Sequence, residues 1–173
     1  MLADRHLIEK QPRQGHSVKQ LNLTEIHELY DVRLVLESFI MEQICRNGLD
    51  NAVLLALQQR WTRLYEGLPE MTADPASADE EFHQAFARAV ANRTMAAMLR
   101  DIDDRIRFVR IADITSAERL GVTCQEHLEI VDAVRRHDAD KAVEALRRNI
   151  EGGRNKVESA VKEALASAHE IHG

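Results

Sequence analysis

The sequence predicts an all-α protein, an antiparallel bundle of six to seven helices. Only three prolines and seven glycines occur among the 173 residues, and these residue types most often interrupt helices. Apolar side chains recur every three or four positions through most of the chain, which is the period of an amphipathic helix. Hydrophobic residues make up 45% of the chain, enough to form the buried core of one domain.

Composition also narrows the class of protein and its compartment. No apolar run approaches the roughly 20 residues that a membrane span requires, and the N-terminus lacks the apolar segment of a signal peptide. Cys45 and Cys124 are too few for a disulfide scaffold, so we expect a cytoplasmic protein without a membrane partner. The net charge of −6 argues against a nucleic-acid-binding surface over the whole domain, because phosphate binding requires clustered Lys and Arg.

Local signals predict where each element begins and ends. Residues 1–21 show no helical period, and two strand-like runs around a Pro/Gly turn predict a hairpin there. Thr24, Ser77 and Thr94 are expected to cap helix N-termini, because a side-chain oxygen can accept a hydrogen bond from the first backbone amides. Glycine or proline should end the first two helices, and residues 115–121 should break or bend the chain. In residues 22–173 the expected helices are 24–47, 50–68, 77–92, 94–114, 122–136 and 139–168.

Polar residues on the apolar faces of three helices are the candidate metal ligands. Asp79 and His83 lie four residues apart, one above the other on a helix face that also carries phenylalanines. His127 and Asn149 fall on the apolar faces of the fifth and sixth helices. If the four converge, two imidazoles, a carboxylate and an amide oxygen could hold Zn, Ni or Mn. The alternatives are that each histidine is a hydrogen-bonded core residue, and that Asp79 and His83 only pair with each other.

Two arginines, Arg33 and Arg105, lie on or beside apolar faces. A buried guanidinium requires an anion, and a carboxylate can bind it through two hydrogen bonds. One hypothesis is an internal ion pair, with Glu37 or Asp101 as the partner. The other is a ligand carboxylate that binds between an arginine and the metal.

Four motifs, in this order and at these spacings, carry a resemblance to a known family. They are Glu28-Leu29-Tyr30-Asp31-Val32-Arg33-Leu34-Val35-Leu36-Glu37, Asp79-x-x-Phe82-His83 followed by Asn92, Glu126-His127-Leu128-x-Ile130, and Asp140-x-Ala142 with Leu146-Arg147-x-Asn149-Ile150. Over residues 22–165 the chain resembles the effector-binding domain of GntR-type transcription regulators in the FadR-like branch, called the FCD domain.

This resemblance implies a helical bundle with a central cavity that binds small metabolites, commonly organic acids, and often a metal. The family's usual ligands are one Asp and three His. They fall on Asp79, His83 and His127, and then on Asn149, where the family usually has His. Amide oxygen is a poorer donor than imidazole, so this departure implies a weaker metal site or a lost one. Arg33 matches an arginine common in the family's first helix.

The N-terminal segment is the second departure from the family. Such regulators carry a winged helix-turn-helix that binds DNA, and residues 7–18 look like its last wing hairpin, so residues 1–21 are expected to be the remnant of that wing and the linker. No recognition helix precedes them in this sequence. DNA would therefore be bound only through a winged-helix domain missing from this chain.

The leading hypothesis is the ligand-sensing domain of a bacterial transcription regulator that binds a small carboxylate and forms a homodimer. We expect no enzymatic activity. The first alternative is a metal-dependent enzyme in which Asp79, His83 and His127 hold a Lewis acid, although Glu80 and Glu126, the nearest acidic residues in sequence, point off the ligand face. The second is a dimerisation module that acts on full-length regulators.

Overall fold

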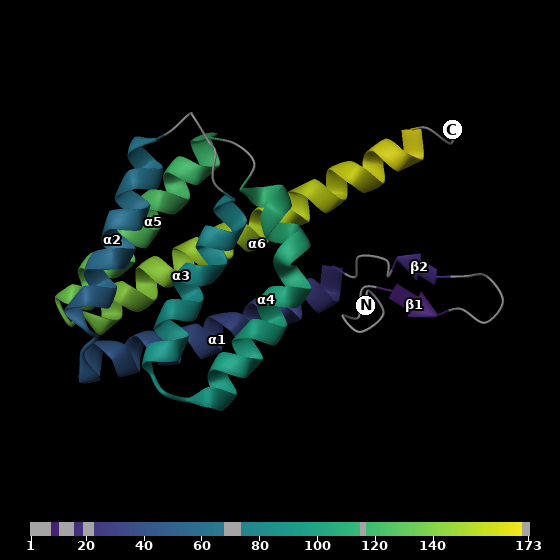
Figure 1. Ribbon diagram of the computed structural model, residues 1–173. Helices are drawn as coiled ribbons and strands as arrows, with labels where there is room; N and C mark the ends of the chain where they lie inside the picture. The colour runs from purple at the N-terminus through teal and green to yellow at the C-terminus, as the bar shows by residue number, and fades with distance from the viewer. Residues whose placement is uncertain (1–7, 11–15, 19–22, 68–73, 115–116, 171–173) are drawn as a thin grey trace.

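Six helices form the bundle in the computed structural model, which describes residues 8–10, 16–18, 23–67, 74–114 and 117–170 (Figure 1). They are α1 (Leu23–Asn47), α2 (Asn51–Glu66), α3 (Pro75–Ala89), α4 (Arg93–Asp113), α5 (Ala117–Arg135) and α6 (Ala139–Glu170). Two short strands, β1 (Ile8–Lys10) and β2 (His16–Val18), precede them and pair antiparallel, with Ile8 opposite Val18. The predicted helical bundle is confirmed, and so is the hairpin, although the turn between its strands lies outside the described residues.

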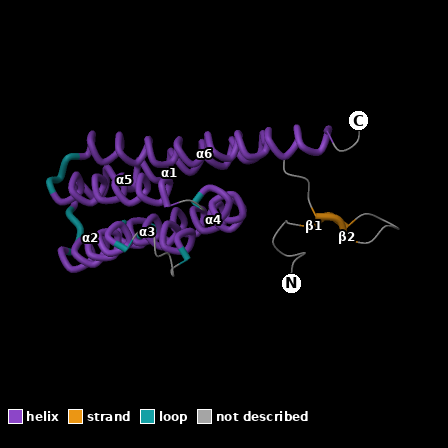
Figure 2. Tube along the Cα trace, turned by 90° about the horizontal axis from the view of Figure 1, so that it is seen from above, coloured by secondary structure: helices purple, strands orange, loops and turns teal. Residues whose placement is uncertain are grey.

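The helices lie in two layers (Figure 2). One layer holds α1, α5 and α6, and the other holds α2, α3 and α4. Contacts between α2 and α5 and between α1 and both α3 and α4 join the layers. Side chains that point inward from both layers therefore meet in the middle of the bundle. None of the described helices combines the length and the apolar character needed to cross a membrane.

Aromatic side chains fill the core between the layers. Trp61 of α2 and Phe82 and Phe86 of α3 are fully buried. Their rings meet edge to face, with centroids 5.7 Å apart for Trp61 and Phe82 and 5.0 Å apart for Phe82 and Phe86. This is a preferred geometry for aromatic pairs, so the centre of α3 is held firmly against its neighbours.

The starts of α3 and α4 differ from the prediction by two or three residues. Asp74, not Ser77, caps α3, because its side chain accepts a hydrogen bond from the Ser77 amide. The next residue, Pro75, suits the first helical position, where no backbone N–H is required. In the same way Asn92, not Thr94, caps α4 by accepting from the Met95 amide.

The predicted break at residues 115–121 is wrong for most of its length. The fifth helix already begins at Ala117, so Gly121 lies inside α5. Glycine within a helix costs roughly 1 kcal/mol relative to alanine. The neighbouring Leu120 and Thr123 are buried, and their packing outweighs that cost.

Candidate metal centre

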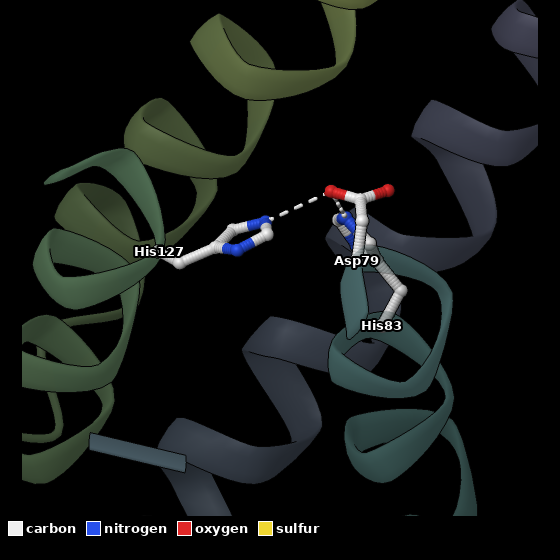
Figure 3. Close-up of side chains that lie close together, drawn as sticks. All are labelled: Asp79, His83 and His127. Atoms are coloured by element: carbon white, nitrogen blue, oxygen red, sulfur yellow. Dashed lines mark ion pairs between the residues drawn. The ribbon is translucent and has the colours of Figure 1, made fainter. Parts of the chain in front are cut away.

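Asp79, His83 and His127 converge in the interior of the bundle (Figure 3). One ligand atom from each side chain lies within 4.8 Å of the other two. The Oδ1 atom of Asp79 is 3.3 Å from His127 Nε2 and 3.7 Å from His83 Nε2. The three side chains are buried, so the structure brings together three of the four residues predicted as ligands.

Local packing explains why these side chains point at one another. Asp79 and His83 are one turn apart on α3, so their side chains share its inner face. His127 projects from α5 and stacks on Phe82, with ring centroids 3.8 Å apart. Trp61 contacts the same imidazole edge-on at 4.0 Å. The aromatic core therefore sets the orientation of His127.

A glutamate from α1 completes the surroundings of His83. His83 Nδ1 lies 2.5 Å from Glu37 Oε2, and Arg33 Nε donates to Glu37 Oε1 at 2.6 Å. All three side chains are buried. The sequence indicated the pair of Arg33 with Glu37, which the structure confirms. It gave no sign of the contact with His83, which joins residues 46 positions apart.

Arg110 of α4 is a buried cation that was not among the residues predicted from the sequence. Its Nε atom lies 3.4 Å from Asp79 Oδ2, and its Nη2 donates to Asp103 Oδ1 at 2.7 Å. Gln84 donates to the other oxygen of Asp103 at 2.6 Å. A signal was present, because Asp103, Ile106 and Arg110 follow one another at spacings of three and four residues, which places them on one helix face.

The charges in this cluster shift its pKa values. Burial alone would raise the pKa of Glu37, but His83 and Arg33 outweigh it and lower that pKa to about 2. Burial is likewise outweighed at Asp79, whose pKa falls well below its usual range beside His83 and Arg110. Burial lowers the pKa of His127 to about 4. At neutral pH both carboxylates are thus ionised and His127 is neutral, which are the protonation states that metal ligands require.

The pKa of His83 moves the other way. Burial alone would lower it, but the facing carboxylates of Glu37 and Asp79 raise it above its usual value. The ring is therefore the group in the cluster that most readily carries an extra positive charge. A metal cation that bound at Nε2 would take the place of that charge.

Several buried nitrogens of the cluster have no hydrogen-bond partner among the described residues. They are His83 Nε2, both ring nitrogens of His127, Arg33 Nη2, and Arg110 Nε and Nη1. Buried polar atoms are nearly always satisfied in folded proteins, and each orphan costs roughly 1–3 kcal/mol. Two imidazole nitrogens beside a carboxylate are suitable ligands for a divalent transition metal. The guanidinium groups of the two arginines are suitable donors for an anion.

Comparison with known proteins agrees with this architecture. The family model of the FCD domain matches residues 28–152, most of the helical bundle. The chain belongs to the FCD domain family.

Relatives of this FCD domain include bacterial regulators. HTH-type transcriptional regulator YdhC of Bacillus subtilis is 24% identical over 138 residues, which make up 79% of this chain and 61% of that protein. The chain thus spans less than two thirds of the length of this curated relative.

Solved structures show the same fold. E. coli McbR/YncC matches with a TM-score of 0.78 at 13% identity, over 92% of this chain and 76% of that chain. The FCD domain of TM0439 matches in a metal-free form, with a TM-score of 0.69 at 21% identity over 83% of this chain and 98% of that one. Its Zn²⁺-bound form matches with a TM-score of 0.65 at 22% identity over 82% and 96%.

The two remaining predicted residues of this FCD domain, Asn149 and Arg105, have partners of their own. Asn149 of α6 is buried, and its amide donates to Glu126 Oε2 at 2.8 Å. Arg105 of α4 is about one third exposed and pairs with Glu25, with Asp101 a further 3.9 Å contact. The structure therefore gives both residues partners outside the Asp79, His83 and His127 cluster. Their roles as metal ligand and ligand-binding residue stay predictions.

Proposed function

We propose that this FCD domain is the effector-sensing part of a bacterial GntR-family transcription regulator and binds a divalent transition metal at Asp79, His83 and His127. The observation that carries the proposal is the convergence of two imidazole nitrogens, which lack a hydrogen-bond partner among the described residues, on one ionised, buried carboxylate. Zinc suits this donor set, and nickel and manganese are the alternatives. The Zn²⁺-bound FCD domain of TM0439 supports zinc as the first metal to test.

The proposed effector is a small carboxylate that binds beside the metal. Arg33 Nη2 and Arg110 Nη1 are buried nitrogens without a partner among the described residues, and guanidinium groups bind carboxylates in a fixed two-bond geometry. We assign anion binding to Arg33 and Arg110 in preference to Arg105, because both are buried and keep nitrogens without a hydrogen-bond partner in the described part of the chain, whereas Arg105 is about one third exposed and pairs with Glu25. If the bundle has two conformations, a carboxylate bound between the metal and an arginine would shift the equilibrium toward the conformation that binds it more tightly.

We further propose that the domain works in the cytoplasm as a homodimer, and that DNA is contacted only through a winged-helix domain outside this chain. The dimer proposal rests on the α1 outer stripe, which consists of Glu28, Val32, Val35, Phe39, Glu42 and Arg46. Its three apolar side chains are 44%, 70% and 45% exposed, although the stripe lies opposite the side of α1 that faces the core. Spacings that alternate between four and three residues are those of helices that pair along a seam.

The charges of the stripe favour antiparallel pairing with a second copy of the chain. In the antiparallel register that sets Val35 opposite Phe39, each Glu28 faces the Arg46 of the other copy. In a parallel register the same residues would face their own like charges, which is unfavourable. The resulting two-fold contact uses one patch twice, as in most homodimers. The same stripe would serve a dimerisation module that pairs with full-length regulators.

Elemental analysis tests the metal site directly. The protein is purified without chelator and without nickel affinity resin, beside Asp79→Ala and His83→Ala, and thermal unfolding confirms that each variant is folded. We expect about one metal per chain in the wild type and none in the variants. Asn149→His should raise zinc affinity if position 149 contributes a ligand. A folded wild type that takes up no zinc, nickel or manganese would refute the site.

A further inference from the structure

Glu37 lies between the two functional groups of the proposed site. It belongs to α1, is 1% exposed, and contacts Arg33 with one carboxylate oxygen and His83 Nδ1 with the other. A carboxylate buried this deeply is stable only when its oxygens are paired. Its two partners belong to different proposed tasks, because Arg33 would bind the effector and His83 would bind the metal.

The contact with Glu37 decides which nitrogen of His83 can bind a metal. An ionised carboxylate only accepts hydrogen bonds, so at 2.5 Å from Glu37 Oε2 the Nδ1 atom must be the donor. In the neutral ring the lone pair then lies on Nε2. Nε2 is the atom that faces Asp79 Oδ1 at 3.7 Å and that has no hydrogen-bond partner among the described residues.

We propose that Glu37 is a positioning residue that holds His83 in the tautomer and orientation presenting Nε2 to the metal. The inference rests on the proposed metal site and adds α1 to it. Carboxylates that accept from a metal-bound histidine typically change metal affinity by about 10–100-fold when removed. Glu37 touches neither Asp79 nor His127 in the hydrogen bonds and ion pairs of the described residues, so its effect on the metal would pass through His83.

His127 provides an internal comparison. Its ring nitrogens make no contact with Glu37: Nε2 lies 3.3 Å from Asp79 Oδ1, and the ring stacks on Phe82 and meets the edge of Trp61. A change at Glu37 should therefore alter the tautomer of His83 and leave that of His127 unchanged. If Glu37 only neutralised Arg33, neither tautomer would change.

The first test reads the tautomers in metal-free protein by ¹⁵N NMR, at a pH where both rings are neutral. We expect His83 protonated at Nδ1 in the wild type and in Glu37→Gln, whose amide oxygen can still accept. The preference should be lost in Glu37→Leu. The double variant Arg33→Met/Glu37→Leu should also lose it, and it leaves no unpaired buried guanidinium to endanger folding. A wild-type His83 protonated at Nε2 would overturn the inference.

The second test measures zinc affinity by competition with a chelator. We expect a loss of about 10–100-fold in Glu37→Leu and in the double variant, with most of the affinity retained in Glu37→Gln and in the exposed control Glu66→Leu. Unchanged affinity in both leucine variants would overturn the inference while leaving the metal site intact. A wild type that binds no zinc but keeps its Nδ1 proton would instead overturn the proposed metal site, and with it the role of Glu37 toward the metal.

Discussion

Arg110 shows at the residue scale how burial separates residues that look alike in sequence. Arg105 and Arg110 lie on the same helix, five positions apart, and both flank apolar residues. Only Arg110 turns fully inward, where it meets Asp79, whereas Arg105 pairs with Glu25 near the surface. A spacing pattern gives the face of a helix on which a residue lies. It does not say how deeply the neighbouring helices cover the edge of that face.

Replacing Arg110 should weaken carboxylate binding. Lysine in Arg110→Lys keeps the charge and loses the two-pronged geometry, so we expect the stabilisation of zinc-loaded protein by short carboxylates such as acetate, lactate and succinate to fall by about tenfold in apparent affinity. Thermal shift against each acid measures this, and Arg105→Lys is the matched control on α4. Equal losses in the two variants would contradict the assignment of the anion site to Arg110.

Acid should destabilise the metal-free protein through His127. Its pKa is lowered from 6.5 to about 4 on folding, so between these values the unfolded chain binds a proton that the folded protein excludes. The free energy of unfolding then falls as the pH is lowered through this window, by on the order of 2 kcal/mol. The lowered pKa of Glu37 also reduces the free energy of unfolding as the pH falls below about 4.5.

The raised pKa of His83 acts in the opposite direction. Its contribution to the free energy of unfolding is fully present below pH 6.5 and is lost at higher pH.

Urea unfolding of chelator-treated protein at pH 7 and pH 5 measures this dependence. His127→Gln is the comparison variant, because its side chain does not titrate, and its stability should change less between the two pH values. An equal change of stability between pH 7 and pH 5 in the wild type and in His127→Gln would contradict the proposed burial of a neutral His127, because the contribution of His83 is present in both proteins.

At the element scale the helices were predictable from period and composition, and their ends were less so. The first helix was placed to within a residue, because the Asn47-Gly48 step stands where α1 ends. Thr24 was wrongly predicted as its cap, since the helix already begins at Leu23. For α3, Asp74 and Ser77 are both good caps, and the choice depends on Pro75 between them. Gly121 looked like a break, although the helix that contains it packs on both α2 and α6. Tertiary contacts of this kind have no local signature.

The outer side of α1 yields a prediction about association. Phe39→Glu places a charge in the middle of the α1 outer stripe, so it should convert a dimer to monomers while the fold is kept, because the side chain is exposed in the single chain. Sedimentation velocity at several concentrations measures the change. Leu55→Glu is the matched control, since Leu55 is similarly exposed on α2. Dissociation by Leu55→Glu alone would place the interface elsewhere.

On the scale of the whole molecule, the cluster joins side chains from four helices, α1, α3, α4 and α5. The sequence identified inward polar residues on three of them, because each sits in an apolar stripe. It could not show that they converge, since convergence depends on how the two layers are stacked. For the same reason the contact of Glu37 with His83 and the burial of Arg110 were not predicted. Neither were the pairs of Asn149 with Glu126 and of Arg105 with Glu25.

The buried nitrogens in the middle of the bundle that lack hydrogen-bond partners among the described residues have a consequence for the rate at which the protein is degraded in the cell. Proteases cleave transiently opened chains, and anything that binds only the closed form lowers the population they can attack. A metal and a carboxylate that satisfy these nitrogens would tie four helices together at once and so lengthen the half-life of the chain. The amount of the protein would then rise with the supply of the metal and the carboxylate, and this change in abundance would be slower than any change in conformation on binding.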